Sequence, residues 1–140
     1  MFSQRVKSVM ERKKLLTASP QTTVADAARL MQEKEVGAVL VVDDERLVGI
    51  FTERDAVFRV IACELDVRTT CLQDVMTTTP LTVEPDKTFG YALKLMHERG
   101  FRHVPVVADG KPVGIVSARS ALDPDMEEFV SEEQRRRHIS

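Results

Sequence analysis

The segment from Gly49 to Asp55 combines residue types that a helix start can use to hold a polar ligand. Gly49 has no side chain, so a ligand or another backbone could approach the end of a predicted strand closely. Thr52 occupies a predicted N-cap position, where its hydroxyl can bond a backbone amide or a sugar or phosphate oxygen. Asp55 follows on the same side of the helix, and its carboxylate can accept hydrogen bonds from a sugar diol. The same residues also fit a plain capping box, so the motif alone allows a ligand site or a structural cap.

Residues suited to catalysis or metal binding form no recognisable pattern. The histidines, His97, His103 and His138, lack a metal-ligand spacing, and Cys63 and Cys71 are also wrongly spaced. The sequence contains no nucleophile elbow, no P-loop and no glycine-rich dinucleotide motif. We therefore expect that the protein is not an enzyme and that it holds no catalytic cofactor and no metal.

Composition favours a soluble folded chain. The 140 residues are 43% hydrophobic and 30% charged, with a net charge of −2. No apolar run approaches the roughly 20 residues that a membrane-spanning helix needs, and the basic N-terminus lacks the apolar region of a secretory signal. We expect a cytoplasmic protein with no membrane partner. The acidic balance and the scarcity of aromatic residues argue against a nucleic-acid partner.

The elements that must position the motif occur twice. When residues 15–57 are written above residues 80–122, 17 of 43 columns are identical, whereas composition alone would give about three. The matches keep their order along the chain, and Val48-Gly49-Ile50 lies over Val113-Gly114-Ile115. The chain is therefore predicted to contain two copies of one small unit.

Each copy predicts the order β-α-β-β-α. In each copy a short extended piece (residues 15–18, then 81–83) and a proline turn precede an amphipathic helix, whose N-cap is Thr22 or Thr23 in the first copy and Thr88 in the second. One apolar run follows the helix, at residues 36–42 in the first copy and 101–107 in the second, and a second strand then ends in Val-Gly-Ile. A helix between two strands predicts a crossover with parallel strand pairing. The last helix is expected to begin near Glu53 or Ala118. A unit this small cannot bury both faces of its sheet alone, so we expect the copies to pack against each other.

This repeat resembles the CBS domain over about residues 6–125, through the Asp-Val-Met segment before the second copy and the Val-Gly-Ile endings. The resemblance implies an α/β (α+β) fold with two β-α-β-β-α CBS units related by a pseudo-twofold axis, their small mixed sheets packed face to face. We place CBS domain 1 at residues 1–64, a linker at 65–71 and CBS domain 2 at 72–125. A helical or flexible tail would follow at 126–140.

The resemblance also implies a non-catalytic regulatory or sensor module that binds an adenosine-containing ligand in a cleft between the copies. AMP, ATP or NAD is favoured over S-adenosylmethionine, because basic residues are expected to face the cleft. The alternatives are a nucleic-acid-binding module and a purely structural dimerisation module. Homodimers would form through helices that expose Val57, Val60 and Ile61, and the regulated protein partner is unknown.

The resemblance implies two related clefts between the copies. We expect the second cleft to bind adenosine poorly or not at all, because Ser117 can replace Thr52 but Ser120 cannot replace the carboxylate of Asp55. His103 could instead be a structural strand residue, Arg102 could pair with Glu98, and the apolar positions could simply be core. By resemblance, the ribose and phosphate would meet Thr52, Asp55, Arg102, His103 and Arg119; the adenine slot would comprise Ile50, Leu81, Thr82, Val83 and Phe101; and the weaker second cleft would comprise Leu16, Thr17, Val36, Gly37, Ala38, Ser117 and Ser120.

Overall fold

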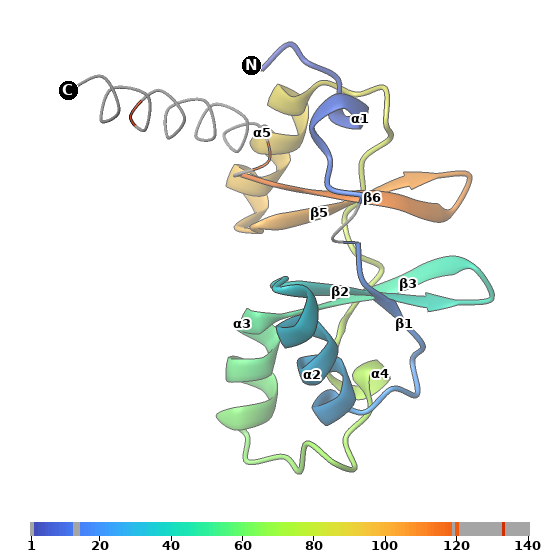
Figure 1. The fold of residues 1–140 in the computed structure, drawn as a ribbon, viewed down its shortest axis with the longest axis vertical. Coiled ribbons are helices and arrows are strands. Elements are labelled where there is room, and N and C mark those ends of the chain that lie inside the picture. Colours follow the sequence, from blue (N-terminus) through green and yellow to red (C-terminus); the bar gives the residue numbers. More distant parts are fainter. Residues whose placement is uncertain (1, 13–14, 119, 121–132, 134–140) are drawn as a thin grey trace.

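The fold is an α+β arrangement of two small sheets with helices on their outer sides (Figure 1). It is seen in a computed structural model that describes residues 2–12, 15–118, 120 and 133. The elements are α1 (Val6–Val9), β1 (Thr17–Ala18), α2 (Val24–Lys34), β2 (Ala38–Asp43), β3 (Arg46–Thr52), α3 (Glu53–Asp55), the π-helix η1 (Ala56–Ile61), α4 (Leu72–Val75), β4 (Thr77–Thr78), α5 (Phe89–Arg99), β5 (His103–Ala108) and β6 (Lys111–Ser117).

The first unit builds a mixed sheet in the order β1-β2-β3-β4. β1 pairs with β2 in parallel after the α2 crossover, and β2 and β3 form an antiparallel hairpin. Thr23, one of the two predicted caps, begins α2 by accepting a hydrogen bond from the amide of Asp26 at 3.2 Å. The predicted crossover and parallel pairing are therefore confirmed in this unit.

The second unit repeats this plan with fewer regular strand residues. β5 and β6 form the hairpin, Val83 makes a parallel bridge to Val106, and Glu11 makes an antiparallel bridge to Ile115. Thr88 caps α5 through the amide of Tyr91, as predicted. Both hairpins shift register at equivalent places, between Val41 and Val42 and between Val106 and Val107. These shared details show that the two units are copies of one fold, as the sequence repeat predicted.

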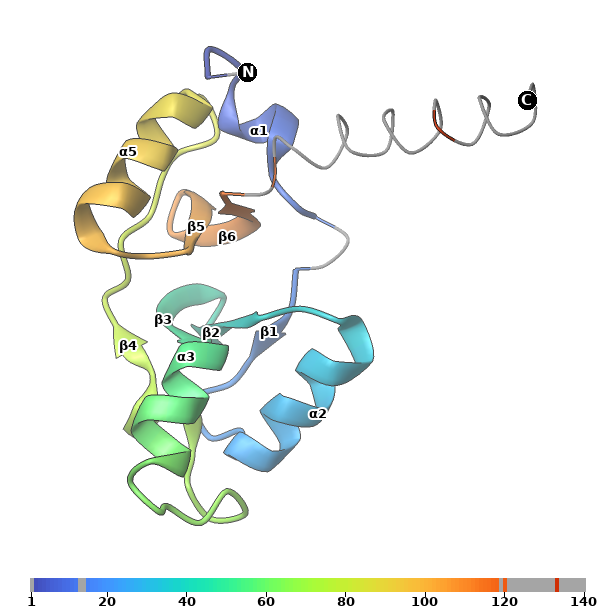
Figure 2. The same cartoon turned by 90° about the vertical axis from the view of Figure 1, so that its left-hand side faces the viewer.

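Two short segments cross between the units. Val6 of α1 is fully buried in the core formed by α5, β5 and β6, although it precedes the first copy in sequence. Leu72 and Val75 of α4 are buried in the core under α2, and β4 completes the first sheet beside β3 (Figure 2). Each unit is thus finished by the segment that precedes the other copy, while the predicted domain boundaries themselves stay a prediction.

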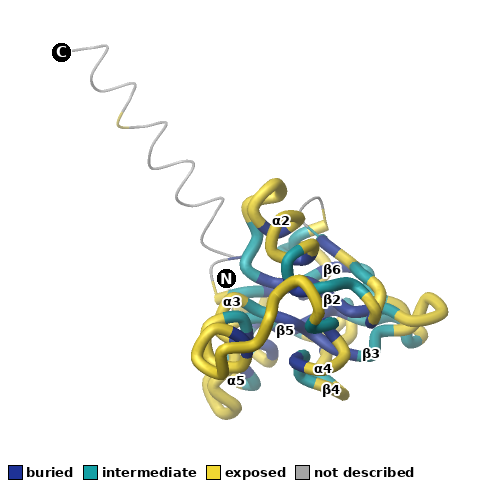
Figure 3. The backbone as a smooth tube through the Cα atoms, turned by 90° about the horizontal axis from the view of Figure 1, so that it is seen from below, coloured by how far each residue is buried: buried dark blue, intermediate teal, exposed yellow. Residues whose placement is uncertain are grey.

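Alternation along the strands buries both faces of the first sheet. Val39, Val41 and Phe51 join the core under the helices, whereas Leu40 and Ile50 point the other way. This second group packs with Ala38 and is covered by Leu15, Leu47 and Ile115, the last of which belongs to β6. Buried residues accordingly follow the strands, and exposed residues follow the helices and loops (Figure 3). The face-to-face packing of the sheets is confirmed.

Some local expectations need correction. Val60 is fully buried, not exposed, because η1 continues α3 with π-helical geometry and turns this side chain into the first core. The strands β2 and β5 begin about two residues later than the apolar runs suggested. Arg119 and the predicted tail at 126–140 lie outside the residues that the structure describes, apart from Glu133. Among the described residues, no helix is both long and apolar enough to cross a bilayer.

Because α4 is buried in the core of the first unit, a substitution in α4 should lower the stability of the protein. Leu72→Ala should destabilise the protein by about 2–5 kcal/mol, because the leucine is fully buried in the core of the first unit. Urea unfolding measures the change, and Leu65→Ala, at a 42% exposed leucine, is the matched control. Equal losses of stability in the two variants would contradict the packing described for α4.

Candidate ligand-binding cleft between the two repeats

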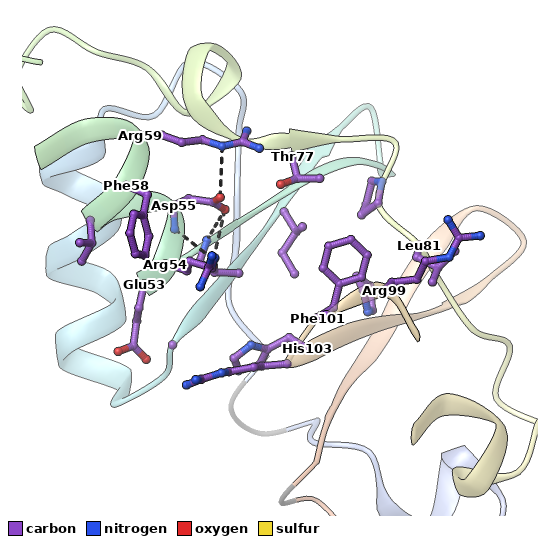
Figure 4. Close-up of a pocket in the computed structure, with 18 residues that line it drawn as sticks. Glu53, Arg54, Asp55, Phe58, Arg59, Thr77, Leu81, Arg99, Phe101 and His103 are labelled. Atoms are coloured by element: carbon purple, nitrogen blue, oxygen red, sulfur yellow. Dashed lines mark hydrogen bonds and ion pairs between the residues drawn. The ribbon is translucent and has the colours of Figure 1, made fainter. Parts of the chain in front are cut away.

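A cavity of about 900 Å³ lies where the two units meet (Figure 4). One wall comes from the end of β3, α3 and η1, and the other comes from β5, the residues that precede it and the segment after β4. A volume of this size is in the range of small-molecule sites. The lining residues are Gly37, Ile50, Thr52, Glu53, Arg54, Asp55, Val57, Phe58, Arg59, Thr77, Pro80, Leu81, Arg99, Gly100, Phe101, Arg102, His103 and Pro105.

Asp55 is held rigidly at the start of α3. Its Oδ2 accepts hydrogen bonds from the backbone amide of Thr52 at 2.9 Å and from the hydroxyl of Thr52 at 3.2 Å. The amide of Asp55 donates back to Oγ1 of Thr52 at 3.3 Å, which completes a capping box. Asp55 is only 8% exposed. The motif therefore forms a capping box, and this cap fixes the direction in which the carboxylate of Asp55 points.

The cap leaves acceptor capacity on the other carboxylate oxygen. Oδ1 lies 3.5 Å from Nε of Arg59, a long ion pair along the helix. Arg59 also donates to the backbone oxygen of Met76 at 3.0 Å, which holds its guanidinium against the segment before β4. An ionised carboxylate offers about four lone-pair positions, so Asp55 can cap the helix and still accept bonds from a ligand.

The lining carries more positive than negative charge. Four arginines and His103 face two carboxylates, those of Glu53 and Asp55. Arg54 stacks over the ring of Phe58, 4.6 Å from its centroid, so its charge is held at the cavity wall. Arg99 reaches the same cavity from the last turn of α5. Such a lining favours an anionic ligand, because arginine binds phosphate and carboxylate groups in a bidentate way.

His103 is the titratable group of the second wall. It opens β5 opposite Ser117 of β6 and lies on the side of the cavity towards which Glu53 points (Figure 4). Burial lowers the pKa of His103 below its ordinary value of 6.5, nearby Glu53 opposes this shift, and Arg102 adds to it. The imidazole is therefore mostly neutral at neutral pH.

The structure brings together seven of the residues predicted for the stronger cleft, which are Ile50, Thr52, Asp55, Leu81, Phe101, Arg102 and His103. Val83 is not on the lining, because it is 3% exposed and belongs to the core of the second unit. Its backbone is tied to β5 through Pro105 and Val107. Thr82 is exposed and also lies off the lining. Arg119 is outside the described residues.

Of the residues predicted for the second cleft, only Gly37 lines the cavity described above. Leu16 and Val36 pack in or against the first core, Ala38 lies between the sheets, and Thr17 is an exposed residue of β1. Gly37 lines the first cavity instead, because the antiparallel pairing of β2 with β3 brings it beside Glu53, whose amide donates to its carbonyl at 3.0 Å.

Ser117 and Ser120 reproduce one hydrogen bond of the Thr52–Asp55 motif without the charge. The amide of Ser117 donates to Oγ of Ser120 at 2.9 Å, which matches the bond from Thr52 to Asp55. Ser120 is 4% exposed. The second copy therefore keeps this backbone-to-side-chain hydrogen bond and lacks the carboxylate.

Several lining residues were not predicted from the sequence. Arg54 lies inside the motif itself, and its place before Asp55 could have indicated a second cation of the cleft. Arg99, Thr77 and Phe58 come from segments with no local ligand signature, so only the folded arrangement identifies them. Within the described residues, no group of three or more histidine, cysteine or acidic side chains could hold a metal ion.

The lowered pKa of His103 predicts how stability changes with pH. Because the folded state binds this proton less readily than the unfolded state, His103 reduces stability as pH falls through and below about 6.5. His103→Gln should therefore lose less stability than the wild type between about pH 7.5 and 5.5, as measured by urea unfolding at both values. His97→Gln, at an exposed histidine of α5, is the control. A His103→Gln variant with an unchanged pH dependence would contradict the burial of this imidazole.

Comparison with known proteins supports the repeat and the fold. A 42% identical match over 118 residues links the chain to the meiotically up-regulated gene 70 protein of Schizosaccharomyces pombe, covering 76% of this chain and 16% of that protein. The chain thus spans a small part of this curated relative. A crystal structure of an uncharacterized conserved protein from Pyrococcus horikoshii superposes with a TM-score of 0.82 at 32% identity, covering 89% of this chain and 94% of that one.

A CBS domain protein from Pyrobaculum aerophilum, solved in complex with AMP, superposes with a TM-score of 0.75 at 25% identity, covering 83% of this chain and 88% of that one. The sequence pattern of the CBS domain matches this chain twice, at residues 6–62 and 72–125. These two matches cover both structural units, and the chain belongs to the CBS domain family as a CBS pair, a type of regulatory module.

Proposed function

We propose that the cavity between the two CBS units binds an adenosine-containing ligand with at least one phosphate, such as AMP, ATP or NAD, and that the protein is a non-catalytic sensor. The observation that carries this proposal is the joint lining of one cavity by a capped carboxylate, apolar side chains and several arginines. The P. aerophilum protein solved with AMP shares this fold and supports the choice of ligand class.

The apolar part of the lining suits a nucleobase. Ile50, Leu81 and Phe101 line the cavity, and Phe101 is 43% exposed, so part of its ring is available to a ligand. A flat aromatic base gains from burial against such side chains, and backbone groups nearby can fix its orientation. Asp55 would then accept hydrogen bonds from the ribose hydroxyls through Oδ1.

The charged part of the lining suits a phosphate. Arg54, Arg99 and Arg102 reach the cavity from three different segments, so one anion could contact cations from both units. This favours AMP, ATP or NAD over S-adenosylmethionine, whose sulfonium is positively charged. Binding of such a ligand would link the units electrostatically as well as sterically.

The helix η1 carries an exposed apolar face that could couple ligand binding to contact with a partner. Val57 and Ile61 of η1 are 48% and 66% exposed, and Phe58 is 57% exposed. Val57 and Phe58 also line the cavity, so the same helix would contact ligand and partner. We infer that a second copy of the chain covers this face as a homodimer. A ligand would act by favouring one packing of the two copies over another.

The ribose assignment predicts a large effect of one substitution. Asp55→Ala should weaken binding of AMP by about tenfold or more in calorimetry, because it removes a charged acceptor from the cavity. The change also removes the Asp55 half of the capping box, at a cost of about 1 kcal/mol of stability, so binding is measured well below the melting temperature. Asp26→Ala, at a first-turn aspartate of α2 outside the cavity, is the control. An AMP affinity equal to that of the wild type would refute the assignment.

The second copy permits the reverse experiment. Ser120→Asp should create a stronger second site, because Ser120 already accepts a hydrogen bond from the Ser117 amide, as Asp55 accepts one from the Thr52 amide. Calorimetry should show the stoichiometry of AMP binding rising towards two per chain, or a weak second event becoming tighter by about tenfold. A thermal melt establishes that the variant is folded. Unchanged stoichiometry and affinity in a folded variant would show that the missing carboxylate does not explain the weakness of this cleft.

A further inference from the structure

Glu53 is one of two acidic side chains in a lining that also carries four arginines. It lines the cavity with Arg54, Arg99, Arg102 and His103, and it is the first residue of α3. Asp55, the other lining carboxylate, points towards Arg59, whereas Glu53 points towards the side where His103 lies (Figure 4). The influence of Glu53 on the pKa of His103 supports this placement across the two units. The two carboxylates therefore place their negative charges at different ends of the cavity.

The position of the Glu53 carboxylate depends on Gly37. The amide of Glu53 donates to the carbonyl of Gly37 at 3.0 Å, and the side chain folds back over the same residue. A Cβ atom at position 37 would collide with Oε1 of Glu53. Glycine at position 37 thus leaves the space that this carboxylate occupies.

The repeat does not preserve this pair. The alignment of the two copies places Gly37 over Arg102 and Glu53 over Ala118. The first copy therefore contributes a negative charge where the second contributes none, and Arg102 of the second copy lines the same cavity as Glu53. The cap at Thr52 does not require this glutamate, because its partners are the amide and carboxylate of Asp55.

We propose that Glu53 is a specificity-determining residue that limits how many phosphate groups a bound ligand can carry. This inference rests on the proposed function and adds a preference within it. With the ribose at Asp55, a single phosphate would meet the arginines, and each further phosphate would bring negative charge towards the carboxylate of Glu53. Repulsion between like charges in a partly desolvated cavity grows with the number of phosphates. Glu53 would thereby favour a monophosphate over a triphosphate.

The test is calorimetry of wild type and Glu53→Gln with AMP and ATP, in EDTA so that no magnesium neutralises the triphosphate. Glu53→Gln should tighten ATP binding by about tenfold and AMP binding by less than about threefold. Glu33→Gln removes the same charge from the exposed face of α2, outside the cavity, and should change neither affinity. Equal changes for AMP and ATP, or weaker ATP binding, would overturn the proposal.

Gly37→Ala provides a second, independent variant. The added methyl group should displace the Glu53 carboxylate and change the ratio of ATP to AMP affinity by at least about threefold. The same substitution in the Glu53→Gln background should change this ratio less, because the displaced group no longer carries charge. Identical effects in both backgrounds would show that Gly37 does not act through Glu53.

Inorganic phosphate and tripolyphosphate separate this inference from the adenosine proposal. Glu53→Gln should raise the preference for tripolyphosphate over phosphate by about tenfold, whether or not the ribose assignment holds. If Asp55→Ala leaves AMP binding unchanged while this preference rises, the adenosine assignment fails and the role of Glu53 stands. If AMP binding depends on Asp55 while the preference stays constant, the role of Glu53 fails alone. If none of the four probes binds wild type or variant, both fail.

Discussion

A sheet of three or four short strands has two apolar faces, and the helices of one CBS unit can cover only one of them. In the first unit, Phe51 and its neighbours pack under the helices, which leaves Leu40 and Ile50 on the opposite face. Ile115 of the second sheet covers that face. The two units also depend on each other through α1 and α4: α1 packs in the core of the second unit, and α4 packs in the core of the first. A cavity lined from both units is a consequence of this pairing.

The repeat keeps the framework and varies the charge. Thr52 with Asp55 and Ser117 with Ser120 make the same backbone-to-side-chain bond, at 2.9 Å in each case. The fold requires only an oxygen acceptor at this position, whereas a charged ligand group distinguishes a carboxylate from a hydroxyl. Pseudosymmetry in the backbone is therefore compatible with one cavity that combines a carboxylate from the first unit with cations from both.

Local patterns in the sequence predicted most of the architecture. Helical spacing and the caps at Thr23 and Thr88 located α2 and α5, and the repeat predicted the packing of the two sheets. The exchange of α1 and α4 had no local signal, because it depends on contacts between distant segments. Val60 was expected on the surface together with Val57 and Ile61, whereas the π-helical geometry of η1 buries it in the first core. Arg99 was not predicted as a cavity residue, because its place there depends on where α5 ends in the folded protein.

Because one cavity is lined from both units, a ligand bound in it would contact both units at once. A titration of the ¹⁵N-labelled protein with AMP, followed by two-dimensional NMR, tests it most directly. We expect saturable shifts for the amides of Thr52 and Asp55 in the first unit and of Phe101 and His103 in the second, all fitting one dissociation constant. Shifts confined to one unit, or the absence of saturable shifts at these four amides, would contradict it.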